Sequence, residues 1–302
     1  MASETKNKST SFQLFPGCTI QNRIPFLEKS AKFVFKKLQI TVKDNPEFGC
    51  CPDPVGVQST DRQSWLTLGA RNLALAETQN EGIISLCNGC TETLKAVQVE
   101  LEENITELEH VQKRLAKVDK TFENHVDVYH FVEFLHEKIG IEKIKDLVTH
   151  PLTNIKIAVH PGCHYSRPSE LVKTDDPMEP TFQKEILRAL GAKVVEYDEE
   201  AMCCSAGVMR NNEEAAMGIL KRKFESILYS EAEILAVNCP ACFQQLESSQ
   251  RLLKRKFEMD LKIPIMYITE LIALAFGATQ KDMGMQYHMV RPKKLLKSYG
   301  FN

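Results

Sequence analysis

Ten cysteines, arranged as two ordered sets of five, are the feature that most constrains this chain. Along 302 residues each set reads as a single cysteine, an adjacent pair and then a C-x-x-C motif. The intervening lengths are 31 and 35 residues in the first set and 39 and 34 in the second. The sets consist of Cys18, Cys50, Cys51, Cys87 and Cys90, and of Cys163, Cys203, Cys204, Cys239 and Cys242. Such ordered repetition indicates an internal duplication.

The residues that flank the cysteines repeat as well. "LFPGC" at 14–18 matches "VHPGC" at 159–163, and "ISLCNGC" at 84–90 matches "LAVNCPAC" at 235–242. Short runs with strand character precede every cysteine group, and amphipathic helical patterns fill the gaps between them. The expected strands lie at 11–15, 38–44, 82–86, 155–159, 192–198 and 233–237, and the expected helices at 23–37, 61–79, 181–190 and 212–229.

Alternating strands and helices predict an α/β fold with a parallel sheet in each half. We therefore expect two duplicated Rossmann-like units, related by a pseudo-twofold axis, with the cysteines just past the carboxyl ends of the strands. The expected domains are 11–150 and 151–302. The first carries a charged helical insertion at about 91–120, which predicts a protruding hairpin with solvated charges or a docking surface for a partner.

Composition narrows the protein class. Apolar residues make up 43% and charged residues 26%, as in soluble globular chains, and the net charge of −2 argues against nucleic acid as a partner. The N-terminal "MASETKNKSTS" lacks the apolar core of a signal peptide, and no window reaches the roughly 18 apolar residues of a membrane span. We expect a cytoplasmic protein, whose thiols stay reduced and serve as metal ligands or catalytic groups.

The number of thiols limits which metal each half can hold. Zinc closes its shell with four ligands, so five cysteines exceed its need, although zinc in one half stays an alternative. Soft thiolates favour iron–sulfur clusters, but the ferredoxin run C-x-x-C-x-x-C-x-x-x-C-P is absent. Five cysteines per half therefore predict an unusual cluster. Gly49, Gly56 and Gly207 are expected to let the backbone approach it closely.

The repeated pattern resembles the cysteine-rich CCG signature of the B subunit of heterodisulfide reductase (HdrB), from about residue 11 to 290. The resemblance implies two noncubane 4Fe-4S clusters, each held by the five cysteines of one half. It also implies the activity: reduction of the mixed disulfide of coenzyme M and coenzyme B to two thiols, with one electron from each cluster. The implied partners are the iron–sulfur C subunit, which carries ferredoxin-type clusters, and the flavin-binding A subunit.

Three further residues are candidates for substrate chemistry. His164 directly follows Cys163, where the first half has Thr19, and is the candidate catalytic proton donor. Arg23 and Arg210 are candidates for binding the anionic groups of the substrate. We expect the substrate between the halves, with its sulfur–sulfur bond between the two clusters.

Two other functions fit the same cysteines. One is that of a CCG protein in a different redox complex, which reduces a quinone or another disulfide. The other is a noncatalytic assembly protein stabilised by zinc, which metal analysis would separate from an iron–sulfur protein.

Overall fold

The computed structural model of the chain describes residues 11–301. Most of the polar N-terminal stretch, on which the expectation of no signal peptide rests, lies outside the described residues. Within the described part, no helix combines the length and apolar character needed to cross a membrane.

Two four-stranded parallel sheets form the centre of the molecule. The first has the order β2-β1-β3-β4 and the second the order β6-β5-β7-β8, which is the same order counted within each half. The strands are β1 (Phe12–Phe15), β2 (Val42–Asp44), β3 (Gly82–Ser85), β4 (Val128–His130), β5 (Lys156–His160), β6 (Lys193–Val194), β7 (Ile234–Val237) and β8 (Ile265–Tyr267). The expected pair of duplicated Rossmann-like units with parallel sheets is confirmed.

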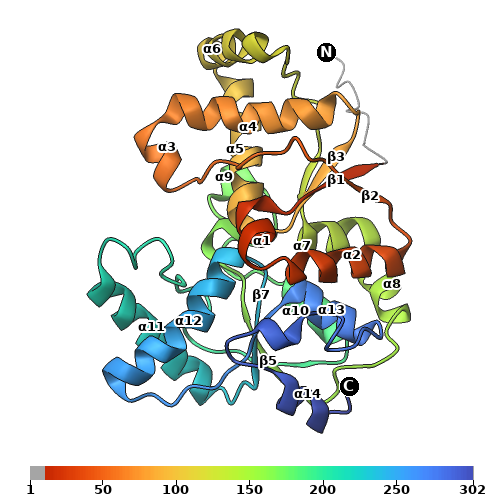
Figure 1. Cartoon of the computed structure of the whole chain (residues 1–302), viewed down its shortest axis with the longest axis vertical. Coiled ribbons are helices and arrows are strands. Elements are labelled where there is room, and N and C mark those ends of the chain that lie inside the picture. Colours follow the sequence, from red (N-terminus) through yellow and green to blue (C-terminus); the bar gives the residue numbers. More distant parts are fainter. Residues whose placement is uncertain (1–10, 302) are drawn as a thin grey trace.

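Helices connect the strands and cover the sheets (Figure 1). Those of the first half are α1 (Gly17–Arg23), α2 (Phe26–Leu38), α3 (Gly56–Thr60), α4 (Arg62–Glu77), α5 (Asn88–Glu103), α6 (Ile105–Leu115), α7 (Phe131–Phe134) and α8 (Ile141–Asp146). Those of the second are α9 (Ser169–Val172), α10 (Phe182–Ala189), α11 (Glu213–Tyr229), α12 (Pro240–Phe257), α13 (Ile268–Ala275) and α14 (Lys293–Ser298).

The central strands follow from their sequences. The runs "GIIS" of β3 and "ILAV" of β7 are buried throughout, as parallel strands covered on both faces require. The edge strands β2 and β6 are shorter than expected. Gln39 ends α2 in the left-handed conformation, so β2 begins later in the sequence than expected. The chain after Val195 turns into the loop that leads to the second cysteine pair.

The charged insertion differs from the expected protruding hairpin. Its first helix, α5, is largely buried, and only α6 and the 3-10 turn Ala116–Val118 extend beyond what the second half has after α12. Figure 1 shows α6 at the end of the molecule farthest from the second half. The charges of α5 misled the sequence prediction because packing buries Glu92 beside His164 and places Lys95 against the buried Glu133.

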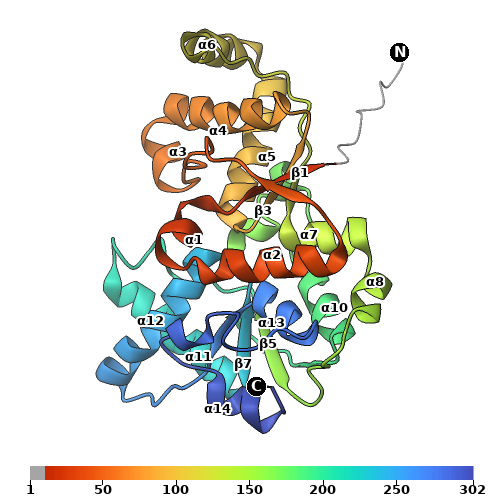
Figure 2. The ribbon, with the colours of Figure 1, turned by 45° about the vertical axis from the view of Figure 1, so that its right-hand side comes forward.

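Reciprocal helix contacts join the halves. Helix α2, after the first strand of one half, packs against α13, after the last strand of the other, and Oγ of Ser30 lies 2.5 Å from Oγ1 of Thr269. In the same way α10 packs against α7 and α8. Nε2 of His136, which lies between these two helices, is 2.7 Å from Glu185 on α10. Figure 2 shows α2 lying across α13 at the junction. This exchange is the packing expected for pseudo-twofold units.

The junction between the expected domains is attached to the second half. The backbone N–H groups of Thr149 and His150 both donate to the carbonyl oxygen of Ala275. The division after residue 150 stays a prediction.

Candidate metal centre

Glycines place the first cysteine of each set. Gly17 and Gly162 both have positive φ, +74° and +79°, which lets the chain turn sharply after β1 and β5. A Cβ on Gly17 would lie 2.9 Å from Sγ of Cys90, and one on Gly162 would lie 3.5 Å from Sγ of Cys242. The two Pro-Gly-Cys loops therefore need glycine, because a Cβ would be too close to the sulfur of Cys90 in the first half and, at 2.6 Å, to Nδ2 of Asn88 in the second.

The glycines named from the sequence do not have this role. A Cβ on Gly49 would meet only Arg71 within 4 Å, and one on Gly56 only Asp53. A Cβ on Gly207 would meet nothing within 4 Å. The tight contacts belong to the loops after β1 and β5, and the expectation that Gly49, Gly56 and Gly207 let the backbone approach a metal stays a prediction.

Side chains from helices hold the loops of the paired cysteines. In the first half Asn72 on α4 donates to the carbonyl of Cys50 at 3.0 Å and accepts from the N–H of Gly49 at 3.0 Å. In the second half the ammonium of Lys223 on α11 donates to carbonyl oxygens in the segment 199–202, directly before Cys203. Both cysteine pairs are thus held by a buried polar side chain.

The C-x-x-C motifs begin the buried helices α5 and α12. Cys87 and Cys239 occupy the N-cap positions, so their sulfurs lie at the positive ends of the helix dipoles. Contacts with neighbouring thiols and the N–H groups of Ala241 and Cys242 hold the pKa of Cys239 well below its usual value. Contact with Cys239 raises the pKa of Cys87 well above its usual value, so the two N-cap thiols do not both ionise by themselves.

The ten thiols form one continuous chain of neighbours through both halves. Within each half every motif cysteine contacts another of the same set, and Cys87 contacts Cys239 across the junction. The Cys163 and Cys203 sulfurs, for example, are 3.9 Å apart. In order of contact the thiols are Cys18, Cys50, Cys51, Cys90, Cys87, Cys239, Cys242, Cys204, Cys203 and Cys163.

Crowding keeps all these thiols from ionising together. Contact with Cys203 raises the pKa of Cys163, while contacts with Cys163 and Cys204 lower the pKa of Cys203 to about 2. Contact with Cys203 likewise raises the pKa of Cys204 to about 12. All ten cysteines are free of disulfides. A polynuclear cation would compensate the charge that the sulfurs cannot hold alone.

The residues present fit an iron–sulfur cluster in each half. Five converging thiols exceed the four ligands of zinc and suit soft, polynuclear iron. Around the second set, buried polar groups lack hydrogen-bond partners among the described residues, which is the environment that sulfide acceptors would complete. These orphaned atoms include both ring nitrogens of His160, Oγ of Ser205 and Nδ2 of Asn238. The same five cysteines of each half would hold the cluster.

His164 joins the two sets across the junction. Its Nδ1 lies 2.6 Å from Oε2 of Glu92, which follows Cys90 on α5 of the other half. The contact with Glu92 raises the pKa of His164 above its ordinary value, against the effect of burial. The side chain keeps 34% of its surface exposed, so the imidazole remains within reach of a small molecule.

The two arginine candidates are exposed. Arg23 is exposed at the last turn of α1. Arg210 is exposed in the turn before α11 rather than at the start of that helix, because Asn212 caps it. Among residues 11–301 neither guanidinium makes a hydrogen bond or an ion pair with a cysteine loop, and their binding role stays a prediction.

Sequence reasoning missed two residues that cross between the halves. His130, the last residue of β4, approaches the carbonyl of Asn238 at 3.2 Å through Nε2. Tyr267, the last residue of β8, donates from its hydroxyl to the carbonyls of Leu86 and Asn238. Leu86 and Asn238 directly precede Cys87 and Cys239. The similar stretches "HFVEFL" and "YITELI" contained this signal, since each begins with one of the two residues.

One cavity lies within the second half and not between the halves. It has a volume of about 240 Å³ and borders Pro161, Arg167 and Tyr197, with its other lining residues also between 161 and 201. The expected position of the substrate between the two sets stays a prediction.

The fold and the sulfurs define a class: a duplicated α/β protein built around ten convergent thiols. A model of the cysteine-rich domain, CCG, matches residues 12–95 and 157–247, once in each half. The chain belongs to this family of CCG proteins, which includes the B subunit of heterodisulfide reductase.

Two relatives support the family assignment. The B subunit of ferredoxin/F420H2-dependent CoB-CoM heterodisulfide reductase from Methanosarcina acetivorans is 32% identical over 280 residues, covering 92% of this chain and 93% of that protein. The 8-methylmenaquinol:fumarate reductase membrane anchor subunit of Wolinella succinogenes is 28% identical over 284 residues, covering 94% of this chain and 98% of that protein. The relatives are thus subunits of oxidoreductase complexes.

A solved structure supports the fold. A hypothetical protein from Helicobacter pylori superimposes with a TM-score of 0.76 at 17% identity over 94% of this chain. This chain spans about half, 53%, of that solved chain.

Proposed function

We propose that the chain is the catalytic iron–sulfur subunit of a heterodisulfide reductase complex. Each half holds one noncubane 4Fe-4S cluster through its five cysteines, and the substrate is the mixed disulfide of coenzyme M and coenzyme B. The observation that carries this proposal is the continuous chain of thiols, in which Cys87 and Cys239 meet across the junction. Two redox sites in contact suit a reaction that needs two electrons at one bond.

The reaction converts one disulfide, two electrons and two protons into two thiols. When bound, each cluster supplies one of the electrons. His164 provides one of the protons, since its exposed edge faces away from the Glu92 carboxylate that orients it. Arg23 and Arg210 bind anionic groups of the substrate, a role that requires their exposed guanidinium groups to move toward it.

Electrons come from partner proteins. The chain lacks both a Gly-rich dinucleotide fingerprint after its strands and a ferredoxin motif. We therefore assign electron delivery to the iron–sulfur C subunit, with its ferredoxin-type clusters, together with the flavin-binding A subunit. The relatives that are named as parts of heterodisulfide reductases support this assignment.

Metal analysis tests the cofactor. Anaerobically purified protein should contain about eight irons and eight sulfides per chain, with little zinc. Cys50→Ala and Cys203→Ala should each remove about half of the iron. Zinc without sulfide, or iron content unchanged in both variants, would reject the proposal.

Thiol release tests the substrate. The chain with reduced viologen dye and the mixed disulfide should release two thiols per two electrons, and NADH alone should give no turnover. If the protein binds both clusters but releases no thiol, the proposed cofactor stands and the proposed substrate is rejected.

The second candidate is a quinone-linked redox complex. The Wolinella succinogenes relative, which belongs to an 8-methylmenaquinol:fumarate reductase, favours this alternative. If the clusters oxidise a menaquinol analogue and the disulfide is not turned over, the quinone-linked function is the correct one.

A further inference from the structure

The two halves differ at two buried positions beside the cysteine sets. The residue before Pro-Gly-Cys is Phe15 in the first half and His160 in the second. The residue that holds the loop of the paired cysteines is Asn72 in the first half and Lys223 in the second, each at the same distance beyond the N-cap of its helix. All four side chains are buried. At these two positions the first set has a phenyl ring and a neutral amide, and the second an imidazole and an ammonium group. The cation at the loop of the first pair is Arg71, which is partly exposed and donates to the carbonyl of Glu47.

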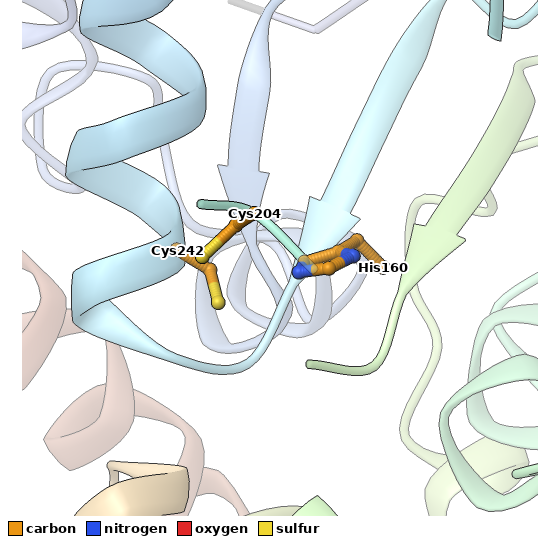
Figure 3. Close-up of side chains that lie close together, drawn as sticks. All are labelled: His160, Cys204 and Cys242. Atoms are coloured by element: carbon orange, nitrogen blue, oxygen red, sulfur yellow. The ribbon is translucent and has the colours of Figure 1, made fainter. Parts of the chain in front are cut away.

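His160 lies directly against the second set. One ring nitrogen and the sulfurs of Cys204 and Cys242 lie within 4.8 Å of one another, and Figure 3 shows the ring facing the two sulfurs. Neither ring nitrogen has a hydrogen-bond partner in the described part of the chain. The imidazole carries at least one N–H in either of its protonation states. The ring nitrogen that lies near the sulfurs of Cys204 and Cys242 is placed to donate to a negatively charged sulfur.

In the first half Phe15 fills the corresponding place. Its ring is buried and packs on Phe48, with centroids 4.9 Å apart. No N–H group can come from this side chain, so the first set lacks the donor that His160 gives to the second.

Lys223 brings a positive charge to the loop of the second pair. Its Nζ donates to the carbonyl oxygens of Glu199 at 2.6 Å, Met202 at 2.9 Å and Glu200 at 3.3 Å. Three carbonyl acceptors require three N–H donors, which only the protonated amine has. Met202 directly precedes Cys203. The carboxylates of this loop have other partners, because Glu200 pairs with Lys184 at 2.9 Å and Glu199 pairs with Arg222.

We propose that His160 and Lys223 make the second cysteine set the more readily reduced of the two, so that the first electron resides there. The inference rests on the proposed function, in which each set holds an iron–sulfur cluster. Reduction adds negative charge, which an N–H donor and a nearby cation stabilise. The first set has neither group at the equivalent positions.

Solvent acts in the opposite direction. Cys18 and Cys50 are exposed, whereas the equivalent Cys163 and Cys203 are half-buried, and water also stabilises added charge. A fixed cation in the low-dielectric interior acts with little screening, so its effect outweighs partial solvation at the rim of the first set. His160 and Lys223 act through the cysteines and are positioning residues.

A redox titration followed by electron paramagnetic resonance tests the inference on the full chain. In wild-type protein two reduction waves are expected, with the second set reduced at the higher potential. Cys50→Ala should keep only the wave of the second set, and Cys203→Ala should keep only the wave of the first set. The two variants thus assign each wave to its set. His160→Phe installs the residue of the first half, and Lys223→Gln keeps N–H donors without the charge. Both variants should move the wave of the second set to lower potential and should leave the wave of the first set in place.

Lys221→Gln is the matched control. It removes the same charge from the same helix, but at an exposed position where Lys221 pairs with Glu225. It should move neither wave. If Lys223→Gln does not fold, His160→Phe still decides the question. The inference would be overturned if His160→Phe did not move the wave of the second set. It would also be overturned if the first set were reduced at the higher potential in the wild-type protein. Absence of iron would instead overturn the proposed function.

Discussion

At the scale of single residues, the unequal neighbours of the two sets determine their chemistry. His164 has no counterpart in the first half, where Thr19 follows the first cysteine. Its partner Glu92 comes from the opposite half, so the imidazole is oriented only when the halves are packed. An oriented imidazole beside a redox centre is suited to deliver a proton.

His164→Ala should reduce the rate of thiol release by roughly 100-fold, the contribution expected of a positioned proton donor. Glu92→Gln should give a smaller loss, because the imidazole stays but loses its charged partner. Iron content should be unchanged in both. His125→Ala, at a side chain with 70% of its surface exposed, is the control. Full turnover in His164→Ala would remove the residue from the mechanism.

At the scale of elements, α5 and α12 use related polar contacts to fix their positions. Lys95 on α5 pairs with Glu133 at 2.7 Å. At the matching position of α12 stands Glu247, and His288 lies between it and Glu270, 2.9 Å from the latter. Both Glu133 and Glu270 also cap their own helices by accepting a backbone N–H. These buried charges tie α5 to α7 in the first half and α12 to α13 in the second.

Lys95→Met should destabilise the protein by about 3–5 kcal/mol, because it leaves the buried Glu133 carboxylate unpaired. It also removes donors to the carbonyl of Val172 and the hydroxyl of Thr174 in the second half. The double variant Lys95→Met/Glu133→Gln should recover part of the loss. The melting temperatures of the two variants, measured under anaerobic conditions, test this expectation. An equal loss of stability in the single and the double variant would contradict the pairing.

His288 should make stability depend on pH. Burial alone would lower its pKa, but the charges of Glu270 and Glu247 outweigh burial and raise the pKa above 6.5. A raised pKa in the folded state contributes stability that is complete below pH 6.5 and is lost as the pH rises through the folded value. Melting temperature should therefore fall as the pH rises above 6.5, and His288→Gln should flatten this slope. An unchanged slope would exclude His288 as its source.

At the scale of the whole molecule, the halves exchange hydrogen bonds at the sulfur chain. His130 of the first half contacts the carbonyl before Cys239, and Tyr267 of the second contacts the carbonyl before Cys87. Burial lowers the pKa of His130 to about 4, so its neutral ring donates through Nε2 while Nδ1 accepts from Val132. Each C-x-x-C motif thus depends on the opposite half.

Tyr267→Phe should cost about 1–3 kcal/mol, since it removes the hydroxyl that donates to the buried carbonyl of Leu86 and leaves the carbonyl of Asn238 with His130 alone. Because those carbonyls precede the motifs of both halves, the electron paramagnetic resonance spectra of both clusters should change. Tyr299→Phe removes a hydroxyl that donates to Glu233 at 2.8 Å, before the start of β7, and should leave the spectra unaltered. A spectral change confined to one cluster would contradict the bridging role.

The sequence alone determined the duplication, the parallel sheets, and the grouping of five thiols at the strand ends of each half. These follow from local patterns: strand and helix periodicity places every cysteine group after a strand, and parallel strands bring their carboxyl ends to one edge. The Pro-Gly-Cys motif likewise contains the glycine that the tight turn requires.

Only the tertiary structure decided how the two sets relate. The contact of Cys87 with Cys239, the pairing of His164 with Glu92 and the crossed bonds of His130 and Tyr267 depend on the packing of α2 on α13 and α10 on α7. No sequence spacing encodes these contacts, because they join residues that only the packed halves bring together. The same reason explains the insertion, where the charges of α5 read as solvated although packing buries Glu92 and places Lys95 against Glu133.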